Sequence, residues 1–360
     1  MKQNKMSGNK GEWSELYAFF RLLADGRVYA ADENVNKIED IYYPIIKIMR
    51  EEKKGSPIDY VIDRSRSCID IVKDGKIVDT ISQTEMAEGA NDLLYEINEG
   101  RNSFEISHIA EFAHGILVHK IKAPSVDKTD IFMQIEDLYT NSRQDVGFSV
   151  KSEIGNPPTL LNASQATNFV FAVHGLNPDF ISQINNIETR EKIKDRMSAI
   201  RSLGGSLEFR KMANKTFSDN LTLIDSLLPE IIASLLKVSY SQGIMNMREL
   251  VNALEKENPC EYSRNDMYGY KIRKVLCACA LGMKPAAEWD GSEEANGGYI
   301  IVKDTGEVLA YHIYNREAFE LYLLNNTKLD RPSTGRYDYL SLYSEDGEVR
   351  MNLNLQIRFV

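Results

Sequence analysis

The feature that most constrains the fold is a pair of short strand-like segments near the middle of the chain. Asp130–Asp137 and Val146–Ser152 alternate in character, and the polar stretch Leu138–Asp145 between them is rich in residues that form turns. Alternation with a period of two is typical of half-buried strands, and two such runs around a turn indicate a β-hairpin. We therefore expect a fold built on a sheet that contains this hairpin.

Segments with helical periodicity lie on both sides of the hairpin. Glu12–Leu23 carries apolar residues at helical spacing, and Gly26 follows it as a stop signal. Lys37–Lys47 has the composition of a strand interrupted by Pro44. Further helices are predicted at Ser82–Glu99, Ile181–Arg201, Leu221–Val238 and Met247–Asn258, and Phe104–Lys120 is expected to begin as a helix and end in a short extended piece. The pattern predicts an α/β protein with a mixed central sheet flanked by helices.

The C-terminal part of the chain has its own pattern. Gly297–Ile313 is a second hairpin candidate with its turn at Asp304–Gly306, and a helix is expected from Glu317 to Leu324. Ala287–Gly298, rich in glycine and acidic residues, is the strongest boundary signal. We therefore predict a core with a helix-rich insertion over residues 1–286 and an α+β region over residues 287–360.

Composition excludes some classes of function. The chain has 53 acidic residues against 43 lysines and arginines, a formal net charge of −10. Proteins that coat nucleic acid without specificity usually carry a basic excess, so this class is disfavoured, although a local basic groove can coexist with an acidic surface. No apolar run approaches the roughly 20 residues of a membrane span, and a cytoplasmic location is expected. The four cysteines and five histidines show no zinc-site spacing.

The central hairpin carries residues suited to phosphodiester hydrolysis. That reaction needs an activated water and charge neutralisation on the phosphate, which magnesium held by carboxylates can supply, and a lysine can stabilise the phosphate or orient the water. A turn centred near Thr140–Asn141 would place Asp130 opposite Val150 or Lys151. The hairpin therefore predicts a magnesium site with catalytic roles for Asp130, Ser149 and Lys151.

This arrangement resembles the nuclease pattern written PD-(D/E)xK, with two departures. Thr129 stands where the proline is usual, and Ser149 stands where a second acidic ligand is usual. The nuclease fold commonly contributes a glutamate from its first helix, which makes Glu15 or Glu12 the candidate for the missing metal ligand. Glu153 is a poorer option, and Asp137 and Asp145 are rivals of Asp130. The ordinary alternatives are a solvated lysine on a strand and glutamates that interact with a helix dipole.

Longer strings carry a second resemblance. Gly8–Leu23, Tyr29–Met49, Gly147–Phe169 and Leu353–Phe359 occur in the same order as similar strings in the HpaII restriction endonuclease family. The resemblance implies a PD-(D/E)xK-like α/β nuclease core with a C-terminal α+β extension. It also implies a type II enzyme that uses Mg²⁺, recognises CCGG in duplex DNA and cuts after the first cytosine. A methyltransferase of the same specificity would be its genetic partner.

DNA contacts are expected in two segments. Gly155–Phe169 directly follows Lys151 and carries polar side chains that can donate to phosphates or bases, of which Asn162, Thr167 and Asn168 are the candidates. A loop and a helix cap are the ordinary alternative for these residues. Arg331–Arg336 combines two arginines with small residues, so Arg331 and Arg336 are the candidates for reading guanine. Arg210-Lys211 and Arg273-Lys274 are further basic pairs.

Two alternatives stay open. A noncatalytic, sequence-specific DNA-binding protein of the same fold would agree with Ser149 in the position of an acid. A metal-independent hydrolase would keep its activity in EDTA. A palindromic target favours a homodimer with two-fold symmetry, although a monomer that cuts one strand at a time is compatible with the sequence.

Overall fold

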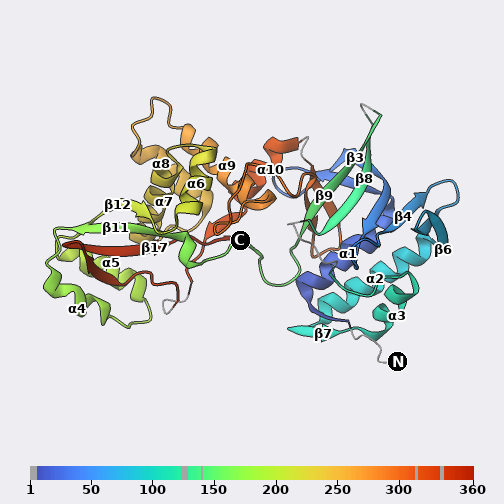
Figure 1. Cartoon of the computed structure of the whole chain (residues 1–360), viewed down its shortest axis with the longest axis horizontal. Coiled ribbons are helices and arrows are strands. Elements are labelled where there is room, and N and C mark those ends of the chain that lie inside the picture. Colours follow the sequence, from blue (N-terminus) through green and yellow to red (C-terminus); the bar gives the residue numbers. More distant parts are fainter. Residues whose placement is uncertain (1–5, 123–128, 139–140, 313–314, 333–335) are drawn as a thin grey trace. The chain divides into compact units, whose positions relative to one another are not determined.

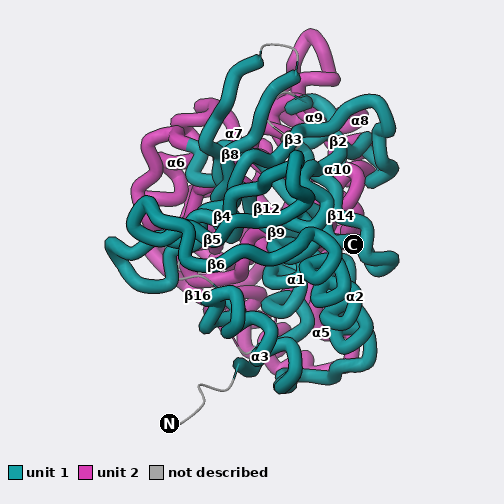
Figure 2. The backbone as a smooth tube through the Cα atoms, turned by 90° about the vertical axis from the view of Figure 1, so that its right-hand side faces the viewer, with its two compact units in different colours: residues 1–158, 293–322 teal, residues 159–292, 323–360 magenta. Residues whose placement is uncertain are grey.

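The computed structural model describes residues 6–122, 129–138, 141–312, 315–332 and 336–360. The chain folds into two compact units (Figures 1 and 2). Unit 1 consists of residues 1–158 and 293–322, and unit 2 consists of residues 159–292 and 323–360. No helix in the described residues is long and apolar enough to cross a membrane.

Unit 1 is built around a nine-stranded mixed sheet with the strand order β2-β14-β13-β9-β8-β3-β4-β5-β6. Strand β2 also pairs with β3. The strands are β2 (Arg27–Ala31), β3 (Lys37–Arg50), β4 (Ile58–Asp63), β5 (Cys68–Lys73), β6 (Lys76–Ser82), β8 (Ile131–Asp137), β9 (Ser142–Ser152), β13 (Gly298–Val302) and β14 (Val308–His312). The short strands β1 (Ser7–Asn9) and β7 (Ser103–Glu105) pair with each other separately.

Helix α1 (Lys10–Asp25) packs between this sheet and helix α2 (Gln83–Glu99). Asn9 and Glu12 form a capping box at its start, and Gly26 ends it in a left-handed conformation with φ 63°. One face of the helix, which includes Trp13, belongs to the hydrophobic core of unit 1. The helix predicted for Glu12–Leu23 is confirmed, because capping and apolar periodicity agree there.

Unit 2 combines helices with two small sheets, ordered β12-β11-β17-β16 and β10-β18-β15. Helices α6 and α7 pack against β12 (Figure 1). The strands are β10 (Thr159–Leu161), β11 (Asn168–His174), β12 (Ser206–Met212), β15 (Thr327–Leu329), β16 (Leu342–Glu345), β17 (Glu348–Asn354) and β18 (Ile357–Phe359). The helices are α4 (Ile181–Asn185), α5 (Lys192–Ser202), α6 (Lys215–Ile224), α7 (Leu228–Gln242), α8 (Met247–Glu257) and α9 (Met267–Leu281), and α10 (Arg316–Asn325) runs from unit 1 into unit 2.

Several helix predictions need correction. The helix expected at the start of Phe104–Lys120 is α3 (Ser107–Gly115), and the chain turns after it at Leu117 with φ 63°. Ile181–Arg201 splits into α4 and α5, and Leu221–Val238 is divided between α6 and α7, where Pro229 lies in the first turn of α7. Proline is favoured at the start of a helix and disfavoured inside one, so the break follows from local chemistry.

The division into units also differs from the predicted boundary at residues 286 and 287. Strand β13 pairs in parallel with β9, and β14 pairs in parallel with β2. The second hairpin therefore returns to the sheet of unit 1. Of the predicted C-terminal region, residues 293–322 belong to unit 1, and residues 287–292 and 323–360 belong to unit 2. A mixed central sheet with flanking helices was predicted correctly, whereas this long-range parallel pairing has no local signal.

Candidate active site

The hairpin formed by β8 and β9 carries the predicted catalytic residues. Its register pairs Ile131 with Phe148, and the backbone N–H of Asp130 donates to the carbonyl of Phe148. Asp130 thus lies next to Ser149, one position from the predicted partner Val150 and two positions from Lys151. Of the residues predicted at the turn, Thr140 lies outside the described residues.

The two oxygens of the Asp130 carboxylate have different partners. Oδ2 accepts hydrogen bonds from the Ser149 hydroxyl at 3.1 Å and from the Val150 N–H at 2.8 Å. Oδ1 accepts a hydrogen bond from Lys122 Nζ at 3.2 Å. The first oxygen fixes the orientation of the carboxylate, and the second faces a cation.

Glu15 reaches the same point from helix α1. The Ser152 hydroxyl on β9 donates to the Ser14 hydroxyl on α1 at 2.9 Å, and this contact ties the helix to the strand directly beside Glu15. Glu15 Oε1 lies 3.1 Å from Lys122 Nζ. Burial raises the pKa of Glu15 from 4.5 to about 7, and the charge of Asp130 adds to this rise while Lys122 opposes it.

Lys151 lies beside Ser149 and the Tyr299 ring. Its Nζ donates to the Ser149 hydroxyl at 3.1 Å and lies 5.2 Å from the centre of the Tyr299 ring. Burial lowers the pKa of Lys151, although the carboxylates of Asp130 and Glu15 act in the opposite direction. Ser149, only 3% exposed, therefore connects Asp130 with Lys151 through its hydroxyl.

Lys122 was not predicted as a site residue. The buried guanidinium of Arg50 donates to the carbonyls of Lys120 and Ile121, and Glu52 accepts from the N–H of His119. These contacts fix the backbone that leads to Lys122. The segment has no periodicity or motif, so the sequence offered no signal beyond a lysine upstream of the hairpin.

The residues present fit a magnesium ion. Mg²⁺ is usually bound through one or two carboxylates while it keeps several waters. Oxygens of Glu15 and Asp130 already converge on one ammonium group, so their positions suit a cation. In the described part of the chain, no group of three or more His, Cys, Asp or Glu side chains is placed to hold a metal, and such a site would therefore rest on two carboxylates.

The other candidate carboxylates have different partners. Glu12 accepts the backbone N–H of Asn9 at 2.8 Å in the capping box of α1, so its carboxylate is engaged at the start of the helix. Asp145 accepts a hydrogen bond from Gln134 at 2.8 Å further along the hairpin. Burial raises the pKa of Glu153, while the charge of Lys303 opposes the rise and that of Asp304 adds to it. Glu15 is the carboxylate that joins Asp130.

The predicted DNA contacts in the segment after Lys151 divide into two kinds. Asn162 is exposed, whereas Thr167 and Asn168 are buried. The Asn168 amide donates to the Tyr337 carbonyl at 2.6 Å, and its oxygen accepts from Asn354 at 2.7 Å. The structure uses these two side chains inside unit 2, where Thr167 takes part in a short cap, and their DNA roles stay a prediction.

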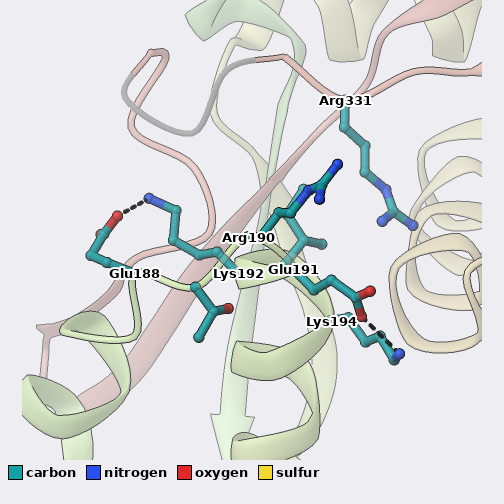
Figure 3. Close-up of a pocket in the computed structure, with 8 residues that line it drawn as sticks. Glu188, Arg190, Glu191, Lys192, Lys194 and Arg331 are labelled. Carbon is teal, nitrogen blue, oxygen red and sulfur yellow. Dashed lines mark hydrogen bonds and ion pairs between the residues drawn. The ribbon is translucent and has the colours of Figure 1, made fainter.

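Arg331 lines a pocket of about 510 Å³ in unit 2 together with the segment 188–194 (Figure 3). Lys192 pairs with Glu188 at 2.6 Å and Lys194 pairs with Glu191 at 2.8 Å. Arg331 donates to the carbonyl of Ser239 and stacks over Tyr240, but its buried Nε has no hydrogen-bond partner among the described residues. Arg336 is exposed, and Ser333–Gly335 between the two arginines lies outside the described residues.

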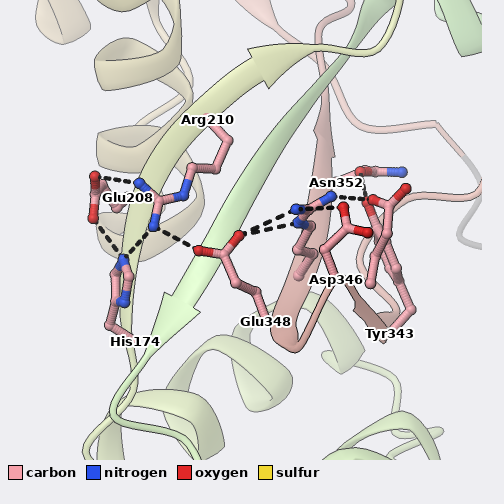
Figure 4. A network of polar contacts seen from close by, with 9 residues as sticks. His174, Glu208, Arg210, Tyr343, Asp346, Glu348 and Asn352 are labelled. Atoms are coloured by element: carbon pink, nitrogen blue, oxygen red, sulfur yellow. Dashed lines mark hydrogen bonds and ion pairs between the residues drawn. The ribbon is translucent and has the colours of Figure 1, made fainter.

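Two of the other basic candidates, Arg210 and Lys274, are already engaged. Arg210 donates to Glu208 at 2.7 Å and to Glu348 at 2.8 Å, within a network on the sheet of unit 2 (Figure 4). Lys274 lies over the ring of Tyr270 at 4.9 Å. These contacts are those of structural ion pairs and stacking.

Comparison with known proteins places the chain in a family. The family model described as HpaII restriction endonuclease matches residues 9–359. The chain is 40% identical to the type II restriction enzyme HpaII of Haemophilus parainfluenzae over 359 residues, which cover 98% of this chain and 99% of the relative. No solved structure matches. The match over nearly the whole length of both proteins shows that this chain belongs to the HpaII restriction endonuclease family.

Proposed function

We propose that this chain is a type II restriction endonuclease that hydrolyses duplex DNA in a magnesium-dependent reaction, recognising CCGG and cutting after the first cytosine. Family membership supports the class of enzyme. The CCGG target and the cut position follow from the resemblance of the sequence. The observation that carries a catalytic reading is the convergence of Asp130, Glu15, Ser149 and Lys151 at one end of the central hairpin.

In this proposal, Asp130 and Glu15 hold the magnesium ion. When bound there, Mg²⁺ would neutralise charge on the scissile phosphate and lower the pKa of a water. Ser149 fixes Asp130 through its hydroxyl, which leaves Oδ1 directed toward the metal position. Lys151, with its pKa lowered by burial, is suited to orient the attacking water and exchange a proton with it.

The rival proposal is a noncatalytic DNA-binding protein of the same fold, since Ser149 stands in the position of an acid. The buried Lys151 favours the catalytic proposal over this rival. A buried ammonium is costly unless it has partners, and the Ser149 hydroxyl and the Tyr299 ring provide them for Lys151. Glu15 also supplies the second carboxylate that Ser149 cannot.

We further propose that DNA is contacted by unit 2 through the pocket beside Arg331. Arg190 lines the same pocket, is exposed, and makes no hydrogen bond or ion pair with any residue that the structure describes. Because the two lysines of the pocket are paired with glutamates, Arg190 and Arg331 provide its positive charge for a phosphate. Asn162 and Arg336, both exposed, are proposed as additional contacts.

A palindromic target favours two copies of the active site related by two-fold symmetry, so we propose a homodimer. We also propose a methyltransferase of the same specificity as the genetic partner, because unmodified host DNA would otherwise be cut. The cytoplasm, where the host DNA lies, is the proposed location.

The deciding experiment compares wild type with Lys151→Met on unmethylated plasmid DNA, in magnesium and in EDTA. The proposal expects discrete fragments with ends at CCGG for wild type in magnesium alone. Lys151→Met should retain DNA binding in a gel-shift assay and lose cleavage. Specific binding without cleavage by wild type would favour the noncatalytic rival, and cleavage in EDTA would contradict the metal-dependent reaction.

A further inference from the structure

Lys122 lies between the two carboxylates proposed as metal ligands, so the role inferred for it rests on the proposed function. Its ammonium nitrogen is 3.1 Å from Glu15 Oε1 and 3.2 Å from Asp130 Oδ1. We propose that Lys122 occupies the cation position of the metal-free enzyme, keeps both carboxylates directed toward that position, and is displaced when magnesium binds.

The surroundings of the two carboxylates support this role. Oδ2 of Asp130 is held by Ser149 and Val150, so the hairpin leaves Oδ1 for a cation. The Glu15 side chain is 16% exposed and that of Asp130 is 10% exposed, so neither charge is well solvated. Two carboxylates in such a place repel each other unless a cation lies between them. Lys122 supplies that cation within the chain itself.

The environment of Lys122 also allows its ammonium group to move away from the two carboxylates. Its side chain is 48% exposed, whereas Lys151 is enclosed by Ser149 and Tyr299. The backbone before Lys122 is fixed by Arg50, which donates to the carbonyls of Lys120 and Ile121. A flexible four-carbon stem on a fixed backbone lets the ammonium swing into solvent without moving the site. A metal ion and this ammonium carry like charge and compete for the same two oxygens, so binding of one disfavours the other.

The first test measures Mg²⁺ binding to the metal-stripped full-length protein by calorimetry, with no DNA present. Lys122→Met removes the competing ammonium and keeps the length of the side chain. We expect Mg²⁺ to bind this variant about three- to tenfold more tightly, as the loss of two partly exposed ion pairs implies. Lys120→Met is the matched control, because Lys120 is an exposed lysine of the same segment whose Nζ bonds to the carbonyl of Glu52 instead. Its affinity should stay close to that of wild type.

The second test uses wild-type protein and does not depend on any variant. Limited acetylation followed by mass spectrometry reports how available each lysine amine is. Lys122 should react less than Lys120 in the metal-free protein and several-fold more once Mg²⁺ is saturating, while Lys120 should not change. A lysine with only a structural role would show no response to the metal.

The outcomes separate this proposal from the proposed function. If wild type binds Mg²⁺ and cleaves DNA, but Lys122→Met binds Mg²⁺ no more tightly or Lys122 reactivity ignores the metal, the displacement is overturned and the enzyme activity stands. Failure of wild type to bind Mg²⁺, together with cleavage in EDTA, would overturn both. Tighter binding by Lys122→Met but not by Lys120→Met, with the rise in reactivity, supports the displacement.

Discussion

In the proposed site, Ser149 departs from the nuclease pattern but contacts both Asp130 and Lys151. A carboxylate at this position would add negative charge opposite Asp130. The hydroxyl instead donates to Asp130 Oδ2 at 3.1 Å and accepts from Lys151 Nζ at 3.1 Å. The neutral hydroxyl therefore forms a hydrogen bond with each of its two charged neighbours. A buried polar group without such partners would carry a desolvation penalty. The second carboxylate comes from Glu15 on a different element.

The residues of the site differ in how far the sequence could identify them. Asp130, Ser149 and Lys151 were predicted because a hairpin brings its own strands together. Glu15 and Glu12 remained equivalent, since both lie in the first part of one helix. The contact between Ser14 and Ser152 separates them by fixing the rotation of α1 against β9. Lys122 could not be predicted, because Arg50, 72 positions earlier in the sequence, holds the backbone that leads to it.

The raised pKa of Glu15 predicts a stability difference that depends on pH. The pKa is about 7 in the folded protein against an ordinary value of 4.5, so the folded state favours the protonated form. The associated stabilisation is complete below pH 4.5 and is lost as pH rises through 7. As pH rises from 4.5 through 7, the free energy of unfolding of metal-free Glu15→Gln should therefore rise relative to that of wild type. The difference should reach roughly 2–3 kcal/mol at pH 8.

Urea unfolding of both proteins at pH 4.5 and pH 8, without metal, measures this difference. Other titrating groups are common to the two proteins and cancel in the comparison. An equal gap at both pH values would contradict the raised pKa. Saturating Mg²⁺ at pH 8 should stabilise wild type more than Glu15→Gln, because the variant lacks one proposed ligand charge.

At the scale of elements, the loop that contains Asn296 and Gly297 approaches the hairpin closely and positions it. The Gly147 N–H donates to the Asn296 side chain at 2.8 Å, and the Gly147 carbonyl accepts from the Gly297 N–H at 2.8 Å. A Cβ on Gly147 would lie 2.7 Å from Thr129 Cγ2 and 2.8 Å from Thr129 Oγ1. Thr129 directly precedes Asp130, so glycine at this point of β9 leaves room for the start of β8.

Gly147→Ala should therefore displace Thr129 and disturb Asp130. Thr129 is β-branched and its hydroxyl donates to the Glu294 carbonyl, so it cannot move without losing that bond. We expect a loss of about 1–3 kcal/mol in the free energy of unfolding and a larger fractional loss of cleavage than of DNA binding. Gly115→Ala is the control, because its Cβ would meet nothing within 4 Å. Equal cleavage by both variants would show that the close contact does not position Asp130.

Elements were predictable where local signals agreed. Helices α1 and α2 combine a capping box with an apolar face, and both were predicted. Strand β3 passes through Pro44 without ending, because pairing with β2, β4 and β8 outweighs the local signal of proline. The missed break between α6 and α7 shows the opposite case, in which an apolar run concealed the start of α7 at Leu228, with Pro229 in its first turn.

At the scale of the whole molecule, the compact units divide the chain differently from the predicted boundary, because the chain leaves unit 1 and returns to it. Strands β13 and β14 join the first sheet through parallel pairs with strands that lie about 150 or more positions earlier, such as Ile300 with Val150. Parallel pairing requires a long connection, and here that connection contains most of unit 2. Composition marks the surface loop near residue 290 but not the partner of the strand that follows it.

In the proposed function, unit 1 contains the hydrolytic site and unit 2 contacts a DNA phosphate. Each lysine or arginine that neutralises a phosphate releases counterions from DNA, so its loss lowers the slope of log K against log salt by about 1. Arg190→Ala removes an exposed arginine without an internal partner among the described residues and should therefore show this change. Affinity should fall to a similar degree for DNA with and without CCGG, since a phosphate contact carries no sequence information.

Lys194→Ala provides the matched comparison, because Lys194 lines the same pocket but pairs with Glu191 at 2.8 Å. Because Glu191 already neutralises Lys194, the loss of Lys194 should change the salt slope little. Any loss of binding would then come from the negative charge that Glu191 leaves unpaired. Fluorescence anisotropy over a range of salt, with both variants in a Lys151→Met background, measures the slopes without cleavage. If the two variants have equal slopes, the pocket does not use Arg190 to hold phosphate. If Arg190→Ala weakens binding only to CCGG, its guanidinium reads a base instead.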